Sequence, residues 1–237
     1  MSAFPPSALE TIAYGDHAAS LATLPFPRTG LGGAMDPRDA MAKRAADIVL
    51  ASLALSVLGV PMLLAAAAIR LTSKGPALFR QQRTGLHGRP FVVLKFRTMR
   101  HAAAPPAHLA QATRDDPRVT RIGAWLRRTS FDELPQLLNV LAGSMSLVGP
   151  RPHAPGTLAA GRPFEAITTR YGARHAVKPG MTGLAQVRGW RGETDTEEKL
   201  LRRIDSDLEY IATWSLGRDL RIIGRTIVTV PRMTNAY

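Results

Sequence analysis

Residues 48–69 read IVLASLALSVLGVPMLLAAAAI, an apolar run that contains no charged side chain and has Pro61 near its middle. At about 1.5 Å per residue, a helix of this length is roughly 33 Å long, which matches the hydrocarbon core of a bilayer. The run is therefore long enough to cross a membrane. Basic residues flank it on both sides, namely Arg38, Lys43 and Arg44 before it and Arg70, Lys74, Arg80 and Arg83 after it.

The basic flanks bear on how this segment meets the membrane. Such flanks are normally kept on the cytoplasmic side, and a straight span keeps only one of them there. Pro61 lacks a backbone donor and its ring clashes with the preceding turn, so a helix bent at this residue enters the membrane and leaves on the same side. We therefore predict a re-entrant membrane helix over residues 43–74, kinked at Pro61. An ordinary single span and a buried core helix stay open as alternatives, although a core helix usually carries a polar stripe.

Composition sets the broad class of the chain. Its 237 residues, 45% of them hydrophobic, are enough for one catalytic-size domain with accessory segments. The formal charge of +13 indicates an anionic partner, whether nucleic acid, an acidic membrane surface or a phosphorylated substrate. The absence of cysteine excludes disulfides and thiolate metal sites. We assign residues 1–42, which are rich in proline and lack the pattern of a signal peptide, to a mobile N-terminal tail, and residues 75–237 to a catalytic domain.

The pattern after the apolar run predicts an α+β domain that is mostly helical and has a small β-hairpin. Residues 77–83 and 91–97 are predicted strands joined by a glycine-punctuated turn. Helices are predicted over residues 118–128 and 132–141, with a loop or weak helix over residues 101–112 before them. Apolar residues at helical spacing predict two more helices, amphipathic and suited to the membrane interface, over residues 200–211 and 216–230, with Ser215 as the cap of the second.

Asp132 and Glu133 are the first candidates for chemistry. Adjacent residues on a helix point about 100° apart, so one carboxylate can act as a nucleophile while the other binds a metal or supports it. A structural alternative stays open, because Ser130 and Glu133 have the spacing of a capping box at a helix start.

The cations around this pair favour chemistry on phosphate. Phosphoryl transfer needs positive charge around the phosphorus, and fixed basic side chains with a magnesium ion supply it. Several basic residues stand on the predicted strands or on turns made rigid by proline and glycine. The candidates for binding substrate phosphates or a nucleotide are Lys95, Arg97, Arg127, Arg128, Arg151, Arg174 and Lys178.

Nucleic-acid binding by a helix-turn-helix over residues 118–141 is disfavoured. The second helix would have to enter the DNA groove, yet it begins with Asp132 and Glu133 and carries no Lys or Arg through Leu141. DNA phosphates would repel it.

Several ordered motifs resemble the bacterial sugar transferases, the monotopic polyprenyl-phosphate phosphoglycosyl transferases of exopolysaccharide synthesis. The resemblance covers about residues 43–230 and leaves out the tail. The motifs are RTG (83–85), KFRTM (95–99), DDPRVTRIG (115–123), LRRTSFDELPQ (126–136), SLVGPRP (146–152) and KPGMTGLAQV (178–187).

The resemblance implies a reaction. A sugar 1-phosphate, by the weaker cue of GWRGETDT (189–196) a hexose such as glucose or galactose, passes from a UDP-sugar to polyprenyl (undecaprenyl) phosphate, and UMP is released. The resemblance makes Asp132 the nucleophile of a covalent phosphosugar intermediate and associates Glu133 with Mg²⁺. It also assigns substrate binding to Arg127 and Lys95.

The resemblance further implies an enzyme of the bacterial inner membrane, in contact with membrane lipids and with its catalytic domain on the cytoplasmic face. Two features depart from the family pattern. Val60 precedes Pro61 where serine is common, and Phe131 stands where leucine is frequent. A non-catalytic membrane scaffold or partner-binding subunit is the alternative function, and the sequence leaves the oligomeric state open.

Overall fold

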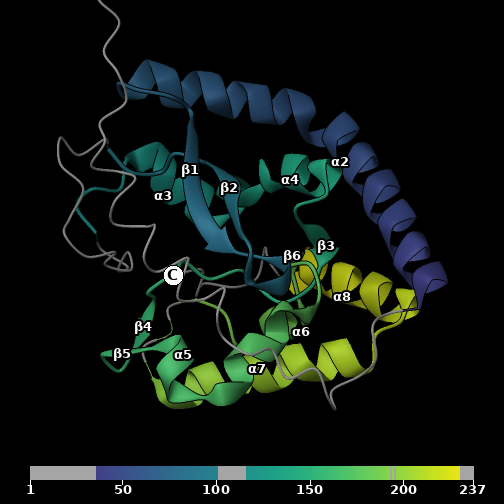
Figure 1. The fold of residues 1–237 in the computed structure, drawn as a ribbon. Coiled ribbons are helices and arrows are strands. Elements are labelled where there is room, and N and C mark those ends of the chain that lie inside the picture. The colour runs from purple at the N-terminus through teal and green to yellow at the C-terminus, as the bar shows by residue number, and fades with distance from the viewer. Residues whose placement is uncertain (1–35, 101–115, 193, 195, 230–237) are drawn as a thin grey trace, which may run out of the picture.

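The computed structural model describes residues 36–100, 116–192, 194 and 196–229. Within them the chain is mostly helical, and a long helix α2 (Pro37–Thr72) lies along the outside of the other elements (Figure 1). The helix begins at Pro37, so residues 37–42 of the predicted tail are helical. Asp36 caps the helix by accepting a hydrogen bond from the backbone N of Arg38 at 2.8 Å, and proline at the first helical position costs no hydrogen bond. The rest of that tail, residues 1–35, and the predicted loop over residues 101–112 lie outside the described residues.

Helix α2 is continuous but bent near the middle of its length (Figure 1). Pro61 lies inside it and removes the hydrogen bond that its N–H would donate one turn back, which is a sufficient cause of a bend. Within the described residues α2 is long and apolar enough to cross a membrane, and only 6% of its most apolar window is buried. Leu53, Val57 and Leu63 are each at least 60% exposed. The buried core helix of a soluble protein is therefore excluded.

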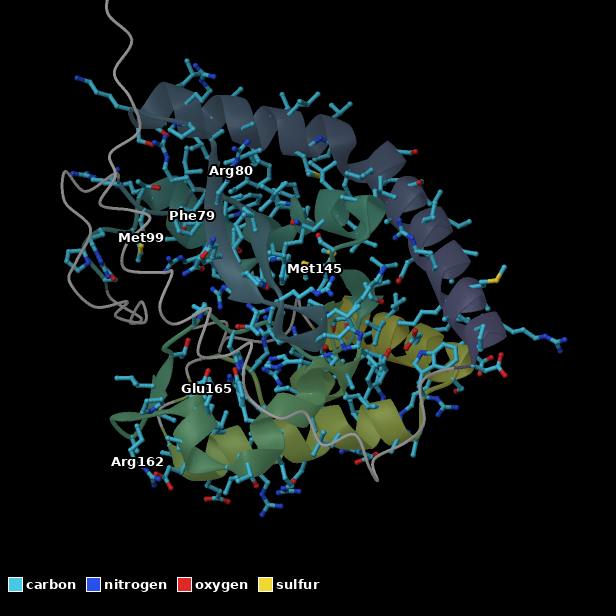
Figure 2. All side chains as sticks on the ribbon, in the orientation of Figure 1. Phe79, Arg80, Met99, Met145, Arg162 and Glu165 are labelled. Atoms are coloured by element: carbon cyan, nitrogen blue, oxygen red, sulfur yellow. The ribbon has the colours of Figure 1, made fainter. Side chains whose placement is uncertain are left out.

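Pro61 divides α2 into a first arm before it and a second arm after it, and both arms pack against the rest of the domain. Ala51 in the first arm joins a core cluster with Val93, Val140 and Met145, and Figure 2 shows Met145 in the interior. In the second arm, Ile69 packs in a separate cluster with Phe96 and Leu126.

The predicted hairpin is present as β1 (Leu78–Thr84) and β2 (Pro90–Phe96), an antiparallel pair joined by the 3₁₀ turn η1 (Leu86–Gly88). The free edge of β2 is covered by a side chain. Asn139, on helix α4 (Gln136–Ala142), donates to the carbonyl of Val92 at 2.7 Å and accepts from the N of Leu94 at 3.0 Å. Its amide thus replaces a neighbouring strand, which fixes α4 against the hairpin.

Residues 178–183, a stretch rich in proline and glycine, contain a strand. β3 (Ser146–Val148) and β6 (Gly180–Thr182) pair in parallel, a non-local pairing that local patterning does not reveal. A Cβ on Gly180 would overlap the backbone of Gly149, and one on Gly149 would overlap that of Lys178. Glycine is required because the two chains approach this closely.

The remaining elements lie in the lower half of the view in Figure 1. The predicted helices are confirmed as α7 (Glu197–Ala212) and α8 (Leu216–Thr229), and Ser215 caps α8 by accepting from the N of Arg218 at 3.2 Å. Helix α8 exposes Leu220, Ile227 and Val228. Shorter elements not expected from the sequence are β4 (Leu158–Ala159), β5 (Arg162–Pro163), α5 (Phe164–Ile167), the 3₁₀ segment η3 (Thr169–Ala176) and α6 (Leu184–Val187).

The prediction of one helix over residues 132–141 was wrong. Helix α3 (Arg121–Arg128) is followed by the 3₁₀ turn η2 (Phe131–Glu133), and α4 begins only after Pro135. Pro135 has no N–H to continue a hydrogen-bonded helix from the turn, and Ser130 has a φ of 55°, which redirects the chain before it. Asp132 and Glu133 therefore lie on a tight turn between two helices.

Candidate active site

The turn η2 does not use Ser130 and Glu133 as a capping box. Ser130 makes no side-chain capping bond, and its Oγ instead accepts a hydrogen bond from Nη2 of Arg191 at 3.1 Å. The carboxylate of Glu133 is bound to cations from other elements, so it does not reach back to the N of Ser130. The capping alternative is therefore excluded, and the acidic pair is available for another role.

Glu133 is clamped by two cations. Nζ of Lys95 on β2 lies 2.8 Å from Oε1, and Arg151, in the turn after β3, donates from Nη2 to Oε1 at 2.5 Å and from Nη1 to Oε2 at 3.0 Å. The planar guanidinium of Arg151 binds the carboxylate of Glu133 in a bidentate pair, which fixes the orientation of the carboxylate. These contacts join the hairpin, η2 and the turn after β3 around one carboxylate.

The two adjacent carboxylates have opposite electrostatic surroundings. Burial disfavours the charge on Glu133, but Arg151 and Lys95 hold its pKa well below the usual range. For Asp132, burial and then the charge of Glu133 raise the pKa to about 6, against the pull of the nearby cations. The side chain of Asp132 makes no ion pair or hydrogen bond with another described residue. Glu133 is thus a fixed anion, whereas Asp132 keeps its oxygens for another partner.

More cations surround the pair than sequence reasoning found. Arg127 on α3, a predicted residue, is held by a 2.9 Å hydrogen bond from Nε to Thr98 Oγ1, and its charge acts on Asp132. Burial and the charge of Arg151 lower the pKa of Arg83 to about 10, while Glu133 opposes that shift. Burial and then the charge of Arg151 also lower the pKa of Arg191, and Glu133 again opposes the shift. Arg83 and Arg191 were not among the predicted site residues.

The sequence did contain a signal for both missed arginines. Arg83 opens the motif RTG (83–85), and Arg191 lies in the stretch GWRGETDT (189–196). Neither is close in sequence to Asp132, so only the fold brings them to the pair. The surplus of positive charge around two carboxylates suits a substrate with several negative charges, such as a diphosphate.

Four of the predicted binding residues do not contact the acidic pair in the described part of the chain, and two of them are Arg97 and Arg128. Arg97 binds the end of α2: Nη2 donates to the carbonyl and the Oγ of Ser73, each at 2.9 Å, and Nη1 donates to the carbonyl of Lys74. Arg128 is exposed and has no hydrogen bond or ion pair with another described residue. Neither Arg97 nor Arg128 contacts Asp132 or Glu133 within the described residues.

Arg174 and Lys178 also lie away from the carboxylate pair. Arg174 is buried and forms an ion pair with Asp207 on α7 at 2.7 Å, and its Nη2 donates to the backbone carbonyl of Arg151 at 2.6 Å. It thus touches the site through Arg151 only. The pKa of Lys178 is lowered by burial and then by Arg44, which places its ammonium beside the first arm of α2.

Glu133 is the candidate magnesium ligand of the acidic pair. Within the described residues, no group of three or more His, Asp or Glu side chains gathers as a ligand set. Mg²⁺ is commonly held by one or two carboxylates with substrate phosphates and water completing its shell, so one carboxylate is enough. The oxygens of Glu133 are engaged by cations, but each carboxylate oxygen has a second lone pair. Glu133 therefore fits a magnesium ion that also binds substrate phosphate, and Asp132 stays free to react.

Comparison with known proteins adds an independent observation. The family model described as bacterial sugar transferase matches residues 38–233. The UDP-glucose:undecaprenyl-phosphate glucose-1-phosphate transferase of Caulobacter vibrioides is 52% identical over 213 residues, which cover 90% of this chain and 75% of that protein. The protein of the same name from Escherichia coli K12 is 50% identical over 185 residues, covering 78% of this chain but 39% of that longer protein. An exopolysaccharide production protein of Rhizobium leguminosarum bv. phaseoli is 51% identical over 191 residues, covering 81% of this chain and 96% of its own length.

Proposed function

Because the chain belongs to the bacterial sugar transferase family, we propose that it transfers glucose 1-phosphate from UDP-glucose to undecaprenyl phosphate and releases UMP. The observation that carries the proposal is the pair of adjacent carboxylates with divergent pKa values inside a group of cations. One carboxylate is held as an anion and the other is left to react. Glucose is chosen because the Caulobacter and E. coli relatives carry it in their names.

In the first step a carboxylate oxygen of Asp132 attacks the phosphorus that bears the sugar. A new bond between that oxygen and the phosphorus forms while the bond to the oxygen shared with the second phosphorus breaks, and UMP leaves with the electron pair. Arg127 and Arg151, whose charges act on Asp132, and Arg83, whose charge acts on Glu133, stabilise the charge on the transferring group. Lys95 and Arg151 keep Glu133 in place beside it.

In the second step an oxygen of undecaprenyl phosphate attacks the same phosphorus, and the bond to Asp132 breaks. The carboxylate is regenerated and the product is undecaprenyl diphosphoglucose. Mg²⁺, held by Glu133 and substrate phosphate, would supply charge neutralisation for the diphosphate. Two successive displacements at one residue predict ping-pong kinetics.

The contacts at the two ends of α2 support a re-entrant topology, and the basic residues that flank the apolar run favour the cytoplasmic face of the inner membrane. Before the apolar run, Lys43 forms a 2.6 Å ion pair with Asp219, and Asp47 accepts from the N of Leu147 at 2.9 Å. After the run, Arg97 binds the carbonyls that follow the helix. One body thus holds both ends, whereas a span would separate them by the roughly 30 Å thickness of the hydrocarbon core. The exposed apolar face of α8 suits contact with the membrane surface.

A topology test uses single cysteines, because the chain has none of its own. Cysteine replaces Met41 before the run or Lys74 after it, and a membrane-impermeant maleimide is added to intact cells and to inverted vesicles. We expect both positions to react in inverted vesicles only. Labelling from opposite sides would show a span and overturn the re-entrant topology.

The reaction is tested by UMP release from a panel of UDP-sugars with magnesium, with and without undecaprenyl phosphate. We expect UDP-glucose to give one UMP per enzyme without acceptor, together with a covalent phosphosugar adduct detected by intact-protein mass spectrometry. Acceptor then allows repeated turnover. No release from any sugar nucleotide would favour the alternative function, a non-catalytic membrane scaffold.

A further inference from the structure

A cavity of about 570 Å³ lies between the second arm of α2 and helix α3. Leu64 and Ala68 line it from α2, Ile122 and Trp125 line it from α3, and Phe131 of η2 closes one wall. These side chains are all apolar, and Arg121 is the charged residue of the lining. A nucleotide sugar needs many polar partners, so this lining suits a hydrocarbon chain and not the donor substrate.

The cavity borders the reacting residue. Phe131 immediately precedes Asp132. The ring of Phe131 stacks on that of Phe96, with ring centroids 6.3 Å apart, and its centroid lies 5.9 Å from that of the Trp125 ring. These rings fix the wall of the cavity together with the turn that carries Asp132. A chain bound here therefore has its head close to the site of phosphoryl transfer.

The cavity is also continuous with the surface proposed to lie in the membrane. Leu64 lines the cavity and is 67% exposed, and Trp125 lines it and is 46% exposed. Leu63 beside it belongs to the exposed apolar face of α2. A lipid chain can thus pass from the bilayer along α2 into the cavity without crossing a polar surface.

From this placement we propose that the cavity binds the isoprene units next to the phosphate of the acceptor lipid. The proposal rests on the proposed function and deepens it, because it assigns a separate binding site to one of the two substrates. It requires that filling the cavity should impair the second transfer and spare the first.

Two neighbouring alanines of α2 provide a matched pair of variants. Ala68 lines the cavity, whereas Ala67 is exposed and does not. In Ala68→Phe the new ring occupies space that the isoprenoid would fill, so we expect the KM for undecaprenyl phosphate to rise about tenfold or more. Adduct formation and the single UMP released without acceptor should stay within about twofold of the unsubstituted enzyme, and Ala67→Phe should change neither. An unchanged acceptor KM in Ala68→Phe would overturn the proposal.

A binding experiment separates this proposal from the proposed function. The full chain in vesicles of phosphatidylethanolamine and phosphatidylglycerol is irradiated with an undecaprenyl phosphate that carries a diazirine in its first isoprene unit. We expect labelling within residues 61–68 or 121–131, which line the cavity, competed by unlabelled undecaprenyl phosphate and not by added phospholipid, and reduced in Ala68→Phe. Equal competition by phospholipid, or labelling elsewhere, would refute the site. Specific labelling without any UMP release would instead refute the proposed function and keep the site.

Discussion

Arg151 holds Glu133 through two hydrogen bonds, from Nη2 to Oε1 at 2.5 Å and from Nη1 to Oε2 at 3.0 Å. Lys95 binds the same carboxylate from the hairpin. The neighbouring Asp132 has no such partner within the described residues. The two adjacent carboxylates therefore have different roles: Glu133 is structural and electrostatic, and Asp132 is reactive.

Glu133→Gln should lower both stability and activity. The folded-state pKa of Glu133 is depressed, so its ionised form stabilises the fold above the unfolded-state pKa, and this contribution is lost as the pH falls through the folded-state pKa. Glutamine removes the charge and leaves two half-buried cations uncompensated, at a cost of about 1–3 kcal/mol. Thermal unfolding in detergent at pH 7.5 should show a lower Tm. An unchanged Tm would show that the ion pairs of Glu133 with Lys95 and Arg151 do not stabilise the fold.

Asp132→Asn should abolish turnover without lowering stability. Its pKa of about 6 lies above the unfolded-state value, so the carboxylate, although mostly ionised near neutral pH, is less stable in the folded than in the unfolded state, and a neutral amide removes that cost. We expect activity to fall by about three orders of magnitude or more, with no adduct by mass spectrometry, and a Tm equal to or above that of the unsubstituted enzyme. An active variant, or an inactive one with a sharply lowered Tm, would contradict the assignment of Asp132 as the nucleophile.

The rate of adduct formation should depend on the ionisation of the same pair. Attack requires the Asp132 carboxylate, whose pKa is raised to about 6, so the rate should reach a plateau above that pH and fall about tenfold per pH unit below it. Single-turnover UMP release between pH 5 and 8 measures the profile. A rate independent of pH over this range would exclude a titrating nucleophile with this pKa.

Local patterns predicted the elements whose hydrogen bonds are local. The hairpin and helices α7 and α8 are where the spacing of apolar residues put them, because strands and helices impose periods of two and 3.6 residues. The pairing of β3 with β6 was not foreseen, since it joins segments far apart in the sequence. The helix expected over residues 132–141 failed at its start, because the conformation of Ser130 and the missing N–H of Pro135 prevailed over helical spacing.

The candidate site was predictable in its carboxylates but not in its full set of cations. Arg97 and Arg128 were predicted because they are close to site residues in the sequence, yet Arg97 binds the backbone after α2 and Arg128 is exposed to solvent. Arg83 and Arg191 reach the pair from distant segments, which only the packed fold reveals.

Arg83→Gln tests whether a cation found only in the structure acts in catalysis. The charge of Arg83 is coupled to Glu133 and Arg151, so its loss should lower kcat/KM for UDP-glucose about tenfold or more. Arg80→Gln on the same strand is the matched control, since Figure 2 shows Arg80 at the end of β1 nearest to α2. Initial rates of UMP release compare the two. Equal effects of both variants would mean that only the general positive charge matters.

The buried pair of Arg174 with Asp207 should support the site through Arg151. Arg174 donates to the backbone carbonyl of Arg151 and to Asp207, and both members of the pair are almost fully buried. Asp207→Asn leaves the guanidinium charge buried without its counter-ion, which costs about 3–5 kcal/mol and should lower the Tm accordingly. Asp205→Asn, two residues earlier on α7, breaks the exposed pair with Arg170 and should cost about 1 kcal/mol or less. At a temperature where both variants are folded, adduct formation should be slower in Asp207→Asn only, because the backbone that positions Arg151 against Glu133 has lost its support. A normal rate in folded Asp207→Asn would limit Arg174 to a stabilising role.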